Sequence, residues 1–116
     1  MTFSITIPYL LRSEANNSDH WSVKGKRRKI IHLLVKNALK THTFDLPCVI
    51  TLTRIGVREL DYDNLVTSFK SARDAIADFL VPGLAPGQAD SDKRLTWHYR
   101  QIKGKPAAFR IEIMSE

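Results

Sequence analysis

Hydrophobic and polar residues alternate near the amino terminus in the stretch TFSITIP, with Phe3, Ile5 and Ile7 on one side. A period of two is typical of a half-buried strand, and it predicts a strand over residues 2–8. The next stretch, YLLRSEANNSDHW, is polar, rich in Asn, Ser and Asp, and lacks a steady period. It therefore predicts a long loop.

Apolar residues recur at helical spacing in two later segments, where they fall at three- and four-residue intervals. This spacing predicts one helix over residues 22–41 and a second from residue 65 to the Pro82-Gly83 pair. The apolar positions are Ile31, Leu34, Val35, Ala38 and Leu39 in the first helix and Leu65, Phe69, Ala72, Ile76 and Phe79 in the second.

Three further strands are predicted from alternation and from β-branched residues. One covers residues 48–55, and two more lie on either side of KGKP, at residues 95–99 and 109–113, where they are expected to pair as a hairpin. The order is then β, α, β, α, β, β. We expect an α+β fold with a small mixed sheet and two helices packed on it.

The chain has 116 residues, which is the size of one domain, so residues 1–116 are expected to form a single unit. Neither a membrane span nor a signal peptide is visible. The single cysteine, Cys48, lies in an apolar run and is expected to be a buried thiol in a reducing, cytoplasmic compartment. The four histidines have no ligand spacing, and the glycines form no phosphate-binding fingerprint, so no small-molecule cofactor is expected.

Charge is distributed unevenly along this basic chain, whose formal net charge is +6. Residues 1–58 carry +7, residues 59–92 carry −5 and residues 93–116 carry +4. A basic body around an acidic middle favours a surface that binds a polyanion, with a divalent metal ion to neutralise the acidic part. The alternative is that the asymmetry of these surface charges is accidental.

The run KGKRRK at residues 24–29 places five cations at the start of the first predicted helix, where the helix dipole disfavours them. A solvated face is one interpretation of this run, and contact with phosphate is the other. The candidate phosphate-binding residues are Lys24, Lys26, Arg27, Arg28, Lys29, Arg54, Arg58, Lys93 and Arg94.

Two aspartates in the stretch RELDYDNLV stand where the second predicted helix begins. Asp63 is expected to be the N-cap of that helix, and helix stability alone would explain an aspartate there, without a catalytic role. Asp61 lies two residues earlier in extended chain, so both carboxylates can reach one hard cation such as Mg²⁺. A third carboxylate is expected from ADSDKRL, as Asp92 or Asp90, although these acids are also common turn formers.

Lys70 follows Asp63 by seven residues, close to two helical turns, and so projects from nearly the same face. Its ammonium can assist catalysis beside the two carboxylates, or it can form an ion pair with Asp74 one turn later. The sequence leaves both roles open.

The motif DYDNL, followed by KSARDAI, by DSDKRL and by basic residues near the C-terminus, resembles the RusA-like Holliday junction resolvases. The resemblance covers most of the chain, with weaker agreement at SITIP and at Asn16-Asn17. The family's lysine usually falls four residues after the second aspartate, where this chain has Thr67, and Lys70 comes three residues later.

The resemblance implies a homodimeric, Mg²⁺-dependent endonuclease, with Mn²⁺ able to substitute, that cuts four-way DNA junctions symmetrically. Bacterial or phage-encoded origin is implied as well. The metal ligands would be Asp61, Asp63 and Asp92, with Asp90 as the alternative third ligand, and Lys70 would act beside them. Two rivals are a DNA-binding module of the same fold that does not cut, and a nuclease for other branched nucleic acids.

Overall fold

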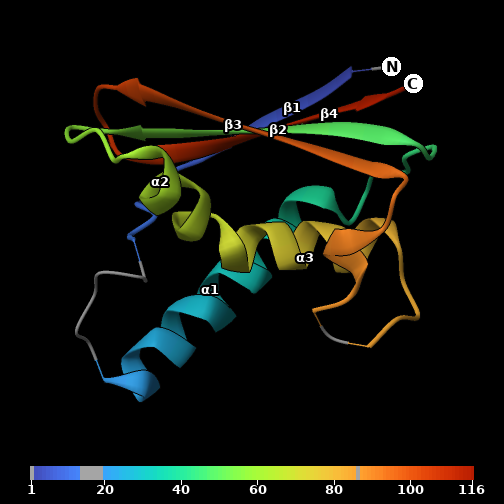
Figure 1. Ribbon diagram of the computed structural model, residues 1–116, viewed down its shortest axis with the longest axis horizontal. Coiled ribbons are helices and arrows are strands. Elements are labelled where there is room, and N and C mark those ends of the chain that lie inside the picture. The colour runs from blue at the N-terminus through green and yellow to red at the C-terminus, as the bar shows by residue number, and fades with distance from the viewer. Residues whose placement is uncertain (1, 14–19, 86) are drawn as a thin grey trace.

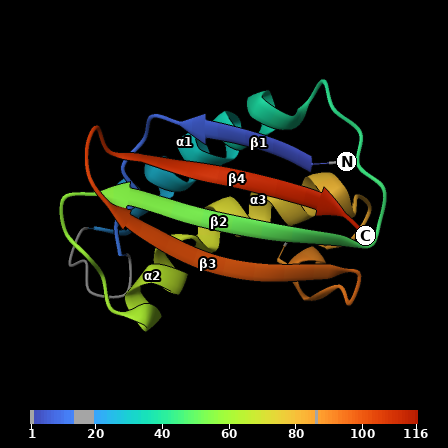
Figure 2. The same cartoon turned by 90° about the horizontal axis from the view of Figure 1, so that it is seen from above.

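A computed structural model describes residues 2–13, 20–85 and 87–116. Its strands form a single sheet in the order β1-β4-β2-β3, and the helices cover one face of it (Figure 1). In Figure 2 the sheet is seen from its uncovered face. The strands are β1 (Thr2–Ile7), β2 (Cys48–Gly56), β3 (Leu95–Lys103) and β4 (Ala108–Ser115), and the helices are α1 (Trp21–Leu39), α2 (Tyr62–Ser68), α3 (Lys70–Leu80) and the short 3-10 helix η1 (Ala89–Ser91).

The predicted α+β class and the order of the main elements are confirmed. The second predicted helix begins three residues earlier than its apolar pattern and is divided into α2 and α3 at Phe69. There the Phe69 N–H bonds the Val66 carbonyl at 3.1 Å, a tighter turn than the α-helix uses. The Phe69 ring is fully buried, so core packing fixes this turn.

The expected hairpin of β3 and β4 is wrong, because β2 lies between these strands. β3 runs parallel to β2, and β4 runs antiparallel to β2 on its other side. The four-residue connection crosses the end of β2, where the Gly104 N–H donates to the Gly56 carbonyl at 2.8 Å. Four residues can span about 13 Å, which is enough to pass over one strand, so loop length did not distinguish the two arrangements.

The core lies between the sheet and the helices. Alternate residues of β1, β2 and β4 point into it, as their period of two predicts, and meet the apolar faces of α1 and α3. Its largest fully buried side chains are Phe69, Phe109, Leu11, Leu39, Ile50, Leu52, Ile76, Ile111 and Ile113.

Cys48 is buried, as predicted, and its thiol donates to the Asp45 carbonyl at 2.9 Å. Burial raises the pKa of this thiol. None of the helices in the described part of the chain is both long and apolar enough to cross a bilayer. Asn16 and Asn17, in the predicted loop, lie outside the described residues.

Candidate nucleic-acid interface

The acidic pair stands at the first turn of α2, but the capping residue is Asp61 and not Asp63 as predicted. The Asp61 backbone is extended, and its Oδ1 accepts from the Asn64 N–H at 2.9 Å. Asp63 lies in the first turn of α2, exposed, and no hydrogen bond or ion pair among the described residues engages its carboxylate. The apolar pattern begins only at Leu65, which is why the predicted start was late.

Two side chains fix the loop that carries this pair. The Leu60 N–H and carbonyl both bond the Gln101 amide on β3, at 2.9 and 2.7 Å. Ser13, in the segment before α1, donates to the Asn64 Oδ1 at 2.9 Å. The start of α2 is thus tied both to the sheet and to the segment that leads into α1.

Arg54 has a structural position that the sequence did not predict. Its side chain is only 6% exposed, and it donates from Nε to the Leu11 carbonyl and from Nη1 to the Arg58 carbonyl, both at 2.9 Å. A β-carbon on Gly56 would approach Nη1 to 2.9 Å, so glycine leaves room for the guanidinium there. The burial of Arg54 and these two hydrogen bonds inside the protein argue against the expected contact of its side chain with phosphate.

The expected third carboxylate does not join the pair. Asp92 bonds the Arg94 backbone N–H at 2.9 Å and its guanidinium at 3.0 Å, and these bonds lower the pKa of Asp92 to about 2. Asp90 forms an ion pair with Arg73 Nε at 3.3 Å. Arg73 in turn lies 4.8 Å from the Trp97 ring centroid and donates to the Tyr99 hydroxyl.

Distance along β3 explains why the acids stay apart. Asp92 precedes Leu95, which pairs with Cys48 at one end of the sheet, whereas Leu60 and the acidic pair are held near Gln101 at the other end. Six residues of strand between Leu95 and Gln101 span about 20 Å. Figure 2 shows α2 and η1 at these opposite ends. Among the described residues, no three His, Cys, Asp or Glu side chains are close enough to hold one metal ion.

A small hollow, here called the junction hollow, opens between the start of α1 and the α2–α3 junction. It has a volume of about 310 Å³ and is lined by Trp21, Lys24, Gly25, Arg28, Thr67, Lys70, Ser71 and Asp74. Thr67 donates to the Asp63 carbonyl at 2.8 Å from one turn away. Thr67 on α2 and Lys70, the first residue of α3, thus both line the hollow opposite the start of α1.

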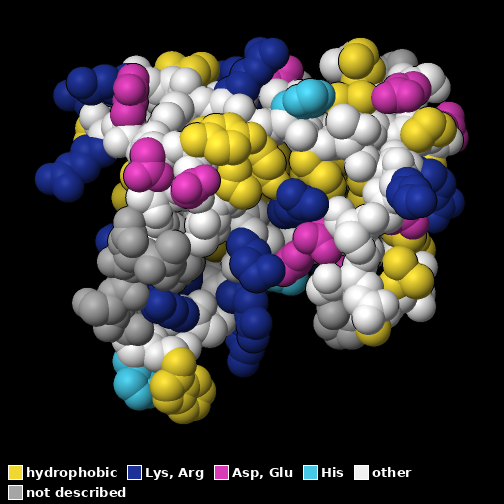
Figure 3. Space-filling model, in the orientation of Figure 1, with side chains coloured by type: hydrophobic (Ala, Val, Ile, Leu, Met, Phe, Trp, Pro, Cys, Tyr) yellow, Lys and Arg dark blue, Asp and Glu magenta, His cyan; other side chains and the backbone are white. Residues whose placement is uncertain are grey.

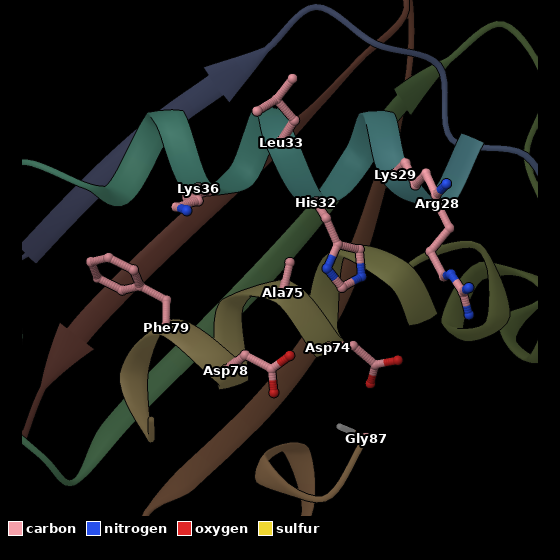
Figure 4. A pocket seen from close by; sticks show the side chains of 10 residues that line it. All are labelled: Arg28, Lys29, His32, Leu33, Lys36, Asp74, Ala75, Asp78, Phe79 and Gly87. Atoms are coloured by element: carbon pink, nitrogen blue, oxygen red, sulfur yellow. The ribbon is translucent and has the colours of Figure 1, made fainter. Parts of the chain in front are cut away.

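A larger hollow continues along the two helices and shares Arg28 and Asp74 with the first. We call it the α1–α3 groove. It measures about 880 Å³ and is lined by Arg28, Lys29, His32, Leu33, Lys36, Asp74, Ala75, Asp78, Phe79 and Gly87 (Figure 4). Figure 3 shows Lys and Arg side chains gathered where α1 and α3 approach one another, beside a group of acidic side chains.

Burial raises the pKa of Asp74, which lines both hollows. Asp90 and Asp78 add to this rise, and Lys70 and His32 oppose it. The charge of Lys70 thus acts on Asp74, and an ion pair between the two side chains stays a prediction.

The other predicted phosphate-binding residues lie in three places. Lys26, Arg28 and Lys29 are exposed on the first half of α1, whereas Lys24 and Arg27 there are half-buried. Arg58 is exposed close to the acidic pair. Lys93 and Arg94 lie at the far end of β3, and their contact with DNA stays a prediction.

Sequence reasoning missed Asp78 and His32 as members of this surface. Each stands one helical turn from a residue that it did single out, since Asp78 follows Asp74 and His32 follows Arg28 by four positions. This spacing was visible, but nothing in it showed that α1 and α3 face each other.

Comparison of the chain with protein-family models gives no match, and neither does comparison with curated protein sequences. The function is therefore argued from the geometry of the junction hollow, the α1–α3 groove and the acidic pair.

Proposed function

We propose that the protein is a Mg²⁺-dependent, structure-selective endonuclease that cuts four-way DNA junctions as a homodimer, as its resemblance to the RusA-like resolvases implies. The observation that carries the proposal is the exposed carboxylate of Asp63, beside Asp61, on the helix whose later turns face the basic start of α1. Phosphates held by Arg28 and Lys29 would bring a DNA strand past these acids. We place this activity in the cytoplasm, on a bacterial or phage-encoded protein.

The residues fit a magnesium ion that is shared with its substrate. Mg²⁺ is commonly held by one or two carboxylates together with substrate phosphates, without a cage made wholly of protein. Asp61 uses Oδ1 for the helix cap and keeps Oδ2, and Asp63 offers its whole carboxylate. A magnesium ion held by these carboxylates would supply activation of water and stabilisation of the leaving oxygen in phosphodiester hydrolysis.

The residues of this chain would supply position and charge. Asp61 and Asp63 hold the ion at the start of α2, and Lys70 stands in the junction hollow to stabilise negative charge that develops at the scissile phosphate. The cations of α1 hold the strand on either side. Asp90 and Asp92, which bind arginines, have no part in this site.

A synthetic four-way junction tests the proposal. Wild-type protein should cut it with Mg²⁺ or Mn²⁺ and not with Ca²⁺, and Asp63→Asn should reduce cutting at least about a hundredfold, because the ion loses a ligand. Binding measured in Ca²⁺ should stay intact. The matched control is Asp92→Asn, which removes the same charge at the other end of β3 and should cut like wild type.

A second candidate is a DNA-binding module that does not cut. The observation in its favour is that the described residues bring no third acid to Asp61 and Asp63. Junction binding without cleavage in Mg²⁺ or Mn²⁺ would establish this module and reject the nuclease. Preferential cutting of Y-shaped DNA or RNA over the four-way junction would instead assign the other rival, a nuclease for different branched substrates.

A further inference from the structure

The two walls of the α1–α3 groove carry opposite charges. Arg28, Lys29 and Lys36 project from α1, and Asp74 and Asp78 project from α3 (Figure 4). Arg28 and Lys36 are eight residues apart, so the cationic wall extends about 12 Å along the helix, and the two aspartates are one turn, about 6 Å, apart. The basic wall suits an anion, whereas the acidic wall repels one.

These charges do not neutralise one another by direct pairing. Within the described part of the chain, no ion pair or hydrogen bond joins a side chain of the α1 wall to Asp74 or Asp78. The groove also holds a polar atom without a partner, since His32 Nε2 is buried and makes no hydrogen bond with any described residue. Its ring points from α1 toward α3 in Figure 4.

A ligand that satisfies both walls needs anionic groups along one edge and hydrogen-bond donors along the other. A single nucleic-acid strand has this form, because its phosphates follow one edge and the amino groups of its bases lie on the other. Leu33, Ala75 and Phe79 add apolar surface against which a base can pack, with Phe79 as the aromatic member. An acidic peptide has backbone N–H donors but no row of amino groups opposite its carboxylates. Paired DNA has its Watson–Crick donors already occupied.

We infer that the α1–α3 groove binds an unpaired DNA strand, with its phosphates on the α1 wall and the amino-bearing edges of its bases on Asp74 and Asp78. The inference deepens the proposed function by naming the part of the substrate that lies beyond the cutting site. It rests on the DNA binding of that proposal and not on cleavage. The Watson–Crick edge of guanine offers a carboxylate two donors, that of inosine one donor beside one carbonyl, and that of thymine one donor between two repelling carbonyls.

Three short strands test the inference in EDTA, where no cutting occurs: an all-thymine strand, the same strand with two central guanines, and one with inosines in their place. Fluorescence anisotropy of wild-type protein should show the guanine strand bound roughly tenfold more tightly than the thymine strand, with inosine between them. The variant Asp74→Asn/Asp78→Asn should lose this order and bind the thymine strand at least as tightly as wild type, because two repelling charges are gone.

Matched controls lie on the uncovered face of the sheet. Glu112→Gln on β4 removes an acidic charge there and should keep the guanine preference. Circular dichroism shows whether the double variant retains the fold. In proton NMR spectra, the guanine strand should shift the ring signals of His32 in the groove and leave those of His98, on β3, unchanged.

Equal binding of the three strands by wild type, with the His32 signals unmoved, would overturn the inference, and normal junction cutting would then leave the proposed function standing. If the strands bind in the expected order but no junction is cut, the inference about the groove stands and the proposed nuclease activity is rejected. A full duplex that displaces the guanine strand at equal concentration would also overturn it, because the groove would then not select unpaired bases.

Discussion

At the scale of single residues, Arg54 shows how burial changes the meaning of a charge. In the sequence it is one more cation near an acidic stretch, but in the fold its guanidinium joins the carbonyls of Leu11 and Arg58 inside the protein. Burial lowers the pKa of Arg54, yet these bonds keep the charged side chain satisfied. The residue therefore positions the loops around the acidic pair.

Arg54→Met should destabilise the protein by about 2–4 kcal/mol, because two buried carbonyls lose their donors. Arg100→Met, at an exposed position of β3, should change the free energy of unfolding by less than about 0.5 kcal/mol. Urea denaturation measures both. Equal stabilities of the two variants would show that the Arg54 hydrogen bonds contribute nothing.

Asp92 gives a prediction about pH. Its pKa is lowered to about 2 from the ordinary 3.8 by hydrogen bonds and charge from Arg94. Since the folded state favours the ionised form, the interaction is fully present above about pH 4 and is lost as the pH falls through 2. The Asp92 carboxyl carbon should titrate near 2 by NMR in wild type and at a higher pH in Arg94→Gln, still below the ordinary 3.8 because the backbone N–H of residue 94 continues to donate. A wild-type midpoint near 4 would contradict the bond.

At the scale of elements, the start of α2 combines a structural and a proposed chemical role in adjacent residues. Asp61 caps the helix through one oxygen, and Asp63 leaves its carboxylate exposed. Asparagine caps a helix about as well as aspartate but carries no charge. Substitutions at Asp61 can therefore separate helix stability from metal binding.

Asp61→Ala should be about 1 kcal/mol less stable than Asp61→Asn, because only alanine removes the cap acceptor. Both variants should lose junction cutting, since both remove the carboxylate. Thermal denaturation gives the first result, and the cleavage assay gives the second. Two equally stable variants would mean that the Asp61 cap adds no stability.

The first half of α1 is expected to supply the salt-sensitive part of DNA binding. Each cation that neutralises a phosphate adds about 0.9 to the slope of log affinity against log salt concentration. Arg28→Gln/Lys29→Gln should therefore lower this slope by roughly 2. Junction binding in EDTA at several salt concentrations measures it, with Arg100→Gln as the control. An unchanged slope in the double variant would remove this part of α1 from the interface.

At the scale of the whole molecule, the arrangement of charge has a simple consequence. The most acidic part of the chain, residues 59–92, folds into the helices that face the basic α1, so opposite charges meet in one groove. A polyanion can then be attracted to the protein while its course over the surface is restricted.

The proposed paired cuts require two sites, so we expect a homodimer in solution. Sedimentation equilibrium should give twice the chain mass of 13.2 kDa at the concentrations at which junctions are cut. A monomer at those concentrations, with coordinated nicking of both strands retained, would contradict this expectation.

The sequence by itself determined the strands, the helices and the acidic pair, because each depends on residues that are neighbours along the chain. The alternation of Phe3, Ile5 and Ile7 and the helical spacing on α1 are local patterns that the fold preserves. Motif reading likewise located Asp61 and Asp63, although not which of them caps α2.

Tertiary structure alone decided which distant segments meet. It placed β2 between β3 and β4, buried Arg54, separated Asp92 from the acidic pair by the length of β3, and set Asp78 opposite α1. These outcomes depend on strand pairing and core packing between residues far apart in the chain. Local periodicity carries no information about such partners, and the same turn sequence serves either a hairpin or a crossing over β2.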